Sequence, residues 1–120
     1  MDANEAGRGS QSLAISNAVV KVLRDYTGRG PTRARTTIGR DEVMVVMGDT
    51  MTKGERKLAD NGRAEHVLRT RHEVQKIMRD ALCAEVERIM ERKVIAFMSD
   101  NHVDPDMGVE AFVLERAETS

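Results

Sequence analysis

The chain has 120 residues, of which 40% are hydrophobic and 32% charged, and its formal net charge is -1. This length predicts one domain with one core, while the near-neutral charge and the 2% aromatic content argue against a dedicated nucleic-acid binder. No apolar run approaches the roughly 18 residues that a membrane span needs, so we expect no membrane insertion.

The amino-terminal residues and the single cysteine bear on organisation and compartment. Residues 1–10 are rich in small and polar side chains with nothing to bury, so we expect a disordered tail followed by one domain over residues 11–117. The tail contains no apolar core of a signal peptide. Cys83 has no second cysteine to pair with, and its apolar neighbours favour a small buried side chain. We therefore expect a cytoplasmic protein.

The first regular element is a helix that begins near Ser10 or Ser12, either of which can cap it, and ends at Thr27. Gly28 is the expected stop because glycine accepts the left-handed conformation at helix ends, and Pro31 discourages a further turn. Apolar residues at spacings of three and four predict one buried face. That face consists of Ile15, Val19, Val22 and Tyr26.

Two strands follow and are predicted to form a hairpin. Residues 33–38 alternate between arginine or threonine on one side and smaller or apolar residues on the other. Residues 39–42 form the turn, and residues 43–47 form the second strand. The side chains predicted to share one face of the first strand are Ala34, Thr36 and Ile38.

Two helices are predicted next. Thr52 and Glu55 match a capping box, in which each side chain satisfies a free amide, and the short helix ends near Asp60. Residues 63–92 contain neither glycine nor proline, so a continuous helix there would be about 45 Å long. A compact domain of this size is only about 35 Å across. The helix therefore either bends or breaks, or it projects and packs on a second copy, which predicts a homodimer.

The last two strands are predicted at residues 94–99 and 109–115, joined by a loop over residues 100–108. The resulting order is helix, strand, strand, helix, helix, strand, strand. It indicates an α+β fold in which two antiparallel β-hairpins form one sheet, packed by the N-terminal helix and the long third helix. The apolar strand residues expected to face inward are Ile38, Val45, Val94 and Val113.

The segment from Arg24 to Arg40 is the candidate binding site. It carries five arginines and one acid, Asp25, so its local charge is +4 (five minus one). Guanidinium groups bind carboxylate or phosphate through paired hydrogen bonds, and glycine allows close backbone approach. The competing interpretation is a helix end followed by a solvated strand whose arginines discourage edge pairing. The predicted binding residues are Tyr26, Gly28, Arg29, Gly30, Arg33 and Arg35.

No catalytic or metal signature accompanies this segment. The acidic loop over residues 100–106 offers oxygen ligands and His102, but its order does not match a calcium loop, so an ordinary hairpin loop is the default interpretation. His66 and His72 are six residues apart, on different faces of a helix, which does not suit zinc. No serine, cysteine or threonine can be paired with a histidine and a carboxylate as a catalytic set. We predict no cofactor and no metal.

The chain resembles the MpsC family. The residues that carry the resemblance are 15–21 (ISNAVVK), 26–31 (YTGRGP), the two strands 34–38 and 43–47, and Leu58 with Ala59, within a matched region of about 12–115. The family name refers to a Na-translocating, membrane-potential-generating system. The resemblance therefore implies an accessory protein linked to ion or bicarbonate transport, and it brings no catalytic residues.

Three functions are compatible with these features. The first is a non-enzymatic accessory or regulatory module that recognises an acidic group, or a protein partner at the membrane, through residues 26–35. The second is a small metabolite-binding domain or enzyme that uses the same region. The third is an oligomerisation module built on the long helix, which requires an apolar exposed side. Convergence of the tyrosine and the arginines in a concave pocket would favour the second function over the first.

Overall fold

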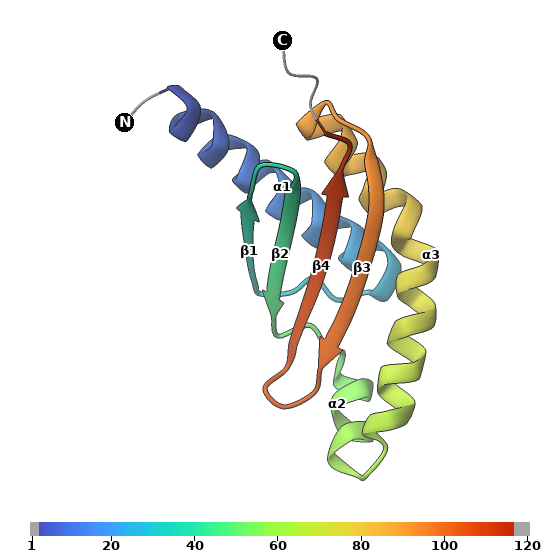
Figure 1. Ribbon diagram of the computed structural model, residues 1–120. Coiled ribbons are helices and arrows are strands. Elements are labelled where there is room, and N and C mark those ends of the chain that lie inside the picture. Colours follow the sequence, from blue (N-terminus) through green and yellow to red (C-terminus); the bar gives the residue numbers. More distant parts are fainter. Residues whose placement is uncertain (1–2, 117–120) are drawn as a thin grey trace.

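The computed structural model describes residues 3–116. The elements in chain order are α1 (Ala3–Thr27), β1 (Arg33–Ile38), β2 (Glu42–Gly48), α2 (Lys53–Asp60), α3 (Ala64–Met90), β3 (Val94–His102) and β4 (Met107–Leu114) (Figure 1). The predicted α+β class and the order of the elements are confirmed. Within residues 3–116, no helix is both long and apolar enough to cross a membrane.

Helix α1 is longer than the sequence pattern indicated. We expected residues 1–10 to be disordered, but the helix begins at Ala3 and residues 3–10 form its first turns. Residues 1–2 of the expected tail lie outside the described residues. The apolar periodicity from which we placed the helix begins later, so it does not mark these turns. At the other end, Gly28 adopts the predicted left-handed conformation with φ +78°, and its amide donates to the Arg24 carbonyl oxygen at 2.9 Å.

The four strands form one antiparallel sheet in the order β1-β2-β4-β3. Strand β2 pairs with both β1 and β4, and Val45 faces Thr36 on one side and Glu110 on the other. After β2 the chain makes α2 and α3, returns as the edge strand β3, and then inserts β4 at the centre. Pairing between β2 and β4 is therefore what joins the two predicted hairpins into one sheet.

The core lies between one face of the sheet and the two long helices, both of which cover that face (Figure 1). The rings of Phe97 and Phe112 pack with centroids 5.2 Å apart, and the Ser16 hydroxyl lies 2.8 Å from that of the buried Thr36. Burial of these side chains is the main term that stabilises the fold. The most completely buried apolar residues are Ile15, Val19, Val43, Val45, Met47, Val67, Leu82, Val86, Phe112 and Leu114.

Most of the predicted inward residues are confirmed. Val45 is fully buried, while Ile38 and Val94 pack against the core partly buried. The prediction for Val113 is wrong, because alternation along β4 buries its neighbours Phe112 and Leu114 and turns Val113 to the other side of the sheet. The strand was predicted correctly, but the residues that face the core are one position away from the one we expected.

The second face of the sheet, which we call the open face, is covered by none of the described helices (Figure 1). Its centre is apolar and its β1 edge is basic. Met44 and Met98 are 44% and 55% exposed there. The residues that register and alternation assign to this face are Arg33, Arg35, Thr37, Glu42, Met44, Val46, Gly48, Ala96, Met98, Asp100, His102, Met107, Val109, Ala111 and Val113.

Helix α3 is one uninterrupted helix of 27 residues. The described chain is elongated, 55 × 28 × 21 Å, so a single copy accommodates the helix and the assumption of a nearly spherical domain was wrong. Helix α2 packs beside its first half, and the exposed side is largely charged, with Arg69, Glu73 and Lys76 among its residues. An oligomer built on an apolar side of α3 is therefore not favoured, and the homodimer stays a prediction.

Neighbouring valines on opposite faces of β2 test this register. Val45→Asp places a charge in the core and should lower the free energy of unfolding by more than about 3 kcal/mol. Val46→Asp, one residue later on the open face, should leave a folded protein and lower the free energy of unfolding by much less than Val45→Asp does. Equal losses of stability in the two variants would contradict the assignment of faces.

Candidate functional site

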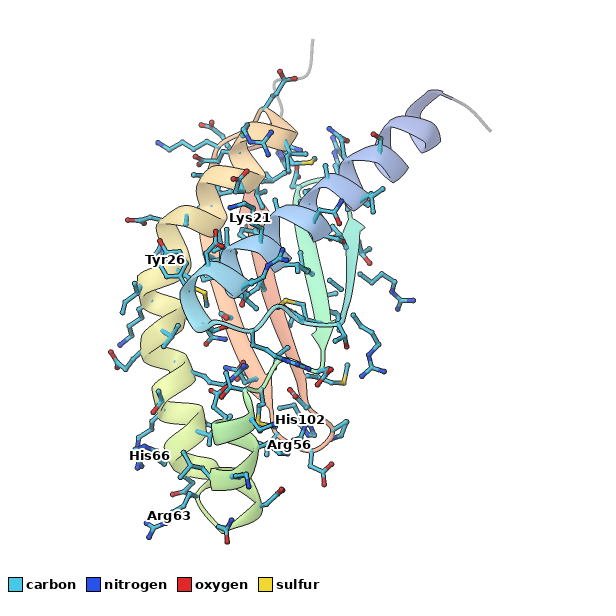
Figure 2. All side chains as sticks on the ribbon, turned by 180° about the vertical axis from the view of Figure 1, so that it is seen from behind. Lys21, Tyr26, Arg56, Arg63, His66 and His102 are labelled. Atoms are coloured by element: carbon cyan, nitrogen blue, oxygen red, sulfur yellow. The ribbon has the colours of Figure 1, made fainter. Side chains whose placement is uncertain are left out.

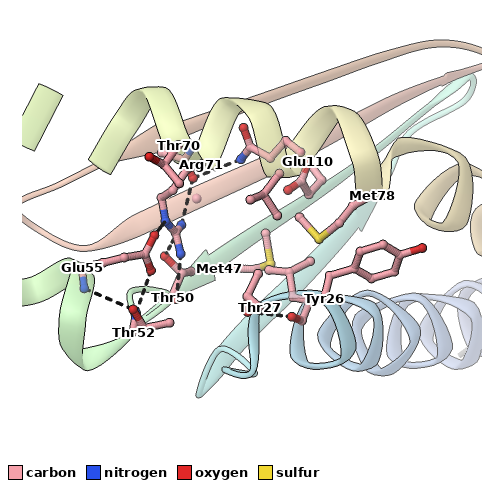
Figure 3. Close-up of a pocket in the computed structure, with 15 residues that line it drawn as sticks. Tyr26, Thr27, Met47, Thr50, Thr52, Glu55, Thr70, Arg71, Met78 and Glu110 are labelled. Carbon is pink, nitrogen blue, oxygen red and sulfur yellow. Dashed lines mark hydrogen bonds and ion pairs between the residues drawn. The ribbon is translucent and has the colours of Figure 1, made fainter. Parts of the chain in front are cut away.

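A cavity of about 300 Å³ opens between the end of α1, the middle of α3 and the inner face of the sheet (Figure 3). Tyr26 projects from the last turn of α1 toward Met78 of α3 and forms one wall (Figure 3). The other walls are mostly apolar, whereas one end is polar. The apolar wall residues are Leu23, Met47, Val74 and Met78, and the polar end is formed by Thr50, Glu55, Arg71, Gln75, Asn101 and Glu110.

Arg71 organises the polar end. Its Nε donates to Glu55 Oε2 at 3.1 Å, its Nη1 to Thr50 Oγ1 at 2.9 Å and to Asn101 Oδ1 at 3.1 Å, and its Nη2 to the Thr50 carbonyl at 2.7 Å. Only 11% of its side chain is exposed. The planar guanidinium suits this role because its fixed fork of donors reaches several acceptors at once. One side chain thus ties α3 to α2, to β3 and to the loop after β2.

The predicted capping box is confirmed and contributes to the same network. Thr52 Oγ1 accepts from the Glu55 amide at 3.1 Å, and Glu55 Oε1 accepts from the Thr52 amide at 2.8 Å. The second oxygen of Glu55 is the one that Arg71 binds. The capping residue therefore anchors the start of α2 to the wall of the cavity.

The acidic hairpin loop supplies a structural carboxylate. Asp106 is buried and accepts from Thr50 Oγ1 at 2.7 Å, from the Met51 amide at 2.9 Å and from Arg56 Nη2 at 3.2 Å. Within residues 3–116, no group of three or more His, Cys, Asp or Glu side chains is arranged to hold a metal ion. His102 and Arg56 lie near this loop in Figure 2, and His66 projects from the start of α3.

Glu110 is the unusual residue of the site. It lies on the inner face of β4 with only 1% of its surface exposed. Its Oε2 has no hydrogen-bond partner among the described residues. Burial raises the pKa of Glu110 from 4.5 to about 7, and the nearby Ser99 and Arg71 side chains offset this only in part. A carboxyl group with this pKa changes protonation near neutral pH.

Gln75 presents a second unpaired acceptor. It is 6% exposed, and its Nε2 donates to Asn101 Oδ1 at 3.1 Å. Its Oε1 has no partner within the described part of the chain. Unpaired buried acceptors are uncommon because each one forfeits the hydrogen bond that it made to water. Two residues that line the cavity thus carry buried acceptors without a hydrogen bond among the described residues.

Of the predicted binding residues, only Tyr26 lines this cavity. It is 48% exposed, because it lies in the last turn of α1 (Figure 2), beyond the part of the helix that the sheet covers. Gly30 packs on its own helix, where an added Cβ would lie 3.3 Å from Val20 Cγ1. The amide of Arg29 donates to Thr27 Oγ1 at 3.1 Å. With the Gly28 amide also paired, this turn does not present a row of free amides.

Arg29 is engaged within its own chain, where it forms an ion pair with Asp49. The Thr32 hydroxyl, which donates to Asp49 Oδ2 at 3.0 Å, and the Arg29 guanidinium hold the pKa of Asp49 below its usual range. Arg33 lies across Gly48, where an added Cβ would be 2.6 Å from Arg33 Nη2. Arg35 is exposed on the open face. The arginines are therefore spread over a surface and do not converge in a pocket.

The sequence interpretation missed the residues that form the cavity. The available signal was Glu110, a carboxylate between two inward positions of an alternating strand, Gly108 and Phe112. Arg71 and Gln75 lie one helical turn apart on α3 and looked like ordinary surface residues of a charged helix. Their significance depends on which segments lie opposite them, and spacing does not encode that.

Fold and site together define a small α+β domain with one covered sheet face, one open sheet face and a ligand-sized cavity beside the core. Residues 8–116 match the family model described as Na+-translocating membrane potential-generating system (MpsC). The chain belongs to this family, which suggests involvement in a Na+-translocating, membrane-potential-generating system. Comparison with curated proteins and with solved structures yielded no match.

Glu110 should make stability depend on pH. Its pKa is higher in the folded than in the unfolded state, so its contribution is fully present below about pH 4.5 and is lost as pH rises through about 7. The free energy of unfolding should fall by about 2–3 kcal/mol between pH 5 and pH 8 through this group. Urea unfolding of parent and Glu110→Gln at both pH values measures the difference. A parallel pH dependence in the two proteins would contradict the assignment.

Proposed function

We propose that this chain is a non-enzymatic, cytoplasmic accessory module of a Na+-translocating, membrane-potential-generating system, and that it regulates the system by binding a small ligand in the cavity between α1 and α3. Family membership supports the association with the system. The cavity supports ligand binding because its size falls at the small end of ligand sites and its lining is mostly apolar with a few polar groups.

The observation that carries this proposal is the pair of unpaired acceptors on Glu110 and Gln75. Both oxygens are buried, so a ligand that donates hydrogen bonds would satisfy them once the two side chains turn toward the cavity. A short alkyl body would contact the apolar walls, including Met47 and Met78. The ligand class that fits is therefore a small amphipathic cation, such as a primary ammonium with a short hydrocarbon chain. Its charge would favour the ionised form of Glu110.

The hydrogen bonds of the charged groups favour a binding role over a catalytic one. Arg71 is held by Glu55, Thr50 and Asn101, so it positions the wall and is not free to take part in a reaction. For the second function, a metabolite-binding domain or enzyme that uses residues 26–35, only Tyr26 and Thr27 of that segment line the cavity. The unpaired acceptors of the cavity do not suit bicarbonate, so a link to bicarbonate transport would have to act through a protein partner.

The arginines suggest a second recognition surface. Arg33 and Arg35 are exposed on β1 beside the apolar centre of the open face. An apolar centre with a charged rim is the usual composition of a protein interface. We propose that this face, and not the cavity, recognises an acidic group on a protein partner.

The cavity proposal is tested with n-pentylammonium, n-pentanol and pentanoate, observed by amide and methyl NMR shifts. Pentylammonium should shift signals of Leu23, Met47 and Met78, and its affinity should rise about tenfold from pH 6 to pH 8 as Glu110, with its pKa of about 7, loses its proton. Glu110→Gln should remove this pH dependence. The control Glu42→Gln, on the open face, should retain it.

Other outcomes would overturn the proposal in distinct ways. Tighter binding of pentanoate at low pH would indicate a ligand that accepts the proton of Glu110. Equal binding of pentanol and pentylammonium at all pH values would indicate an apolar cavity without a role for the carboxylate. Failure of all three probes to shift the wall signals would reject the cavity as a site for this ligand class.

A further inference from the structure

The register of the strands places opposite charges at the two edges of the open face. Arg35 lies beside Val46, Val46 beside Val109, and Val109 beside Asp100, so one row runs from a cation on β1 to an anion on β3. Both charged residues are exposed. They stand at opposite edges of a four-stranded sheet, too far apart to neutralise each other within one copy, because neighbouring strands are about 4.8 Å apart.

The next row is apolar and alternates in size. Thr37 lies beside Met44, Met44 beside Ala111, and Ala111 beside Met98. With Val46 and Val109 of the row before, these side chains form a continuous apolar strip across the centre of the sheet. Isolated exposed apolar residues need no explanation, but a continuous strip on an uncovered sheet face is characteristic of an interaction surface.

We propose that the open face packs against the open face of a second copy of this chain, related by a two-fold axis that runs parallel to the strands between β2 and β4. Sheets that pack face to face lie about 10 Å apart with strand directions within about 30°. This axis sets β1 over β3 of the second copy and β2 over β4. Each row of residues then faces the same row of the second copy, which runs across the sheet in the opposite direction.

Row reversal makes the surface complementary to itself. Arg35 of each copy faces Asp100 of the partner subunit, which forms two symmetric ion pairs at the edges. In the same row, Val46 faces Val109 of the partner subunit at the centre. In the next row, Met44 faces the small Ala111 of the partner subunit. The row on the other side of Arg35 and Asp100 has Arg33 at one end and His102 at the other, so it adds no ion pair to the interface.

Electrostatics select this axis over the alternative. A two-fold axis perpendicular to the strands would set β1 over β1 and bring the arginines of the two copies together, and like charges facing each other disfavour that arrangement. The acidic group that the basic strand recognises is therefore Asp100 of a second copy. This inference rests on the arginine surface of the proposed function and not on the cavity.

Charge reversal tests the interface. Sedimentation velocity at 5–200 µM, about the range in which transient dimers dissociate, should find a dimer of the parent chain. Arg35→Glu and Asp100→Arg should each weaken dimerisation at least tenfold, because each sets two pairs of like charges face to face. The double variant Arg35→Glu/Asp100→Arg should restore it, since the pairs return with opposite polarity. The control Arg79→Glu, on the exposed side of α3, should dimerise like the parent.

Each alternative result overturns the proposal. A parent chain that is monomeric at 200 µM excludes the dimer, and a dimer that persists in both single variants places the contact elsewhere. Single variants that dissociate without rescue in the double variant exclude the two-fold axis proposed here. All four variants alter exposed residues, and circular dichroism melting verifies that they fold. Alkylammonium binding in the cavity is measured separately, so that either proposal can fail without the other.

Discussion

The hydrogen bonds of Arg71 are the interaction on which the functional part of the structure depends. This one guanidinium connects α3 to the capping glutamate of α2, to the loop after β2 and to Asn101 on β3. The residues in these contacts form the polar end of the cavity that lies between the helices and the sheet. Beside this network, Glu110 Oε2 is buried without a hydrogen-bond partner among the described residues.

Coverage of only one face of the sheet divides the molecule into two surfaces with different chemistry. The covered face holds the core and, at its margin, a concave site with unpaired acceptors suited to a small donor ligand. The open face is apolar at its centre and charged at opposite edges, which suits contact with a protein. The basic strand lies on the open face and Tyr26 lies beside the cavity, so the segment that looked like one site in the sequence is divided between two surfaces.

Local features were predictable because their causes are local. The stop at Gly28, the capping box of Thr52 and Glu55 and the alternation along β1 each depend on residues within a few positions of one another. The start of α1 was misjudged because the apolar periodicity that marks the helix begins after its first turns. Val113 was misassigned because an alternating strand has two possible inward sets, and only packing against the helices selects one.

The sequence by itself determined the elements, their order, the α+β class and the family, since periodicity, capping and turn residues act over short distances. Tertiary structure alone decided that β4 inserts between β2 and β3, and with it every cross-strand neighbour. That insertion brings Glu110 beneath α3 and aligns Arg35 with Asp100 in one row. Contacts between residues so distant in the chain depend on how the whole sheet and its helices pack, and no short segment contains that information.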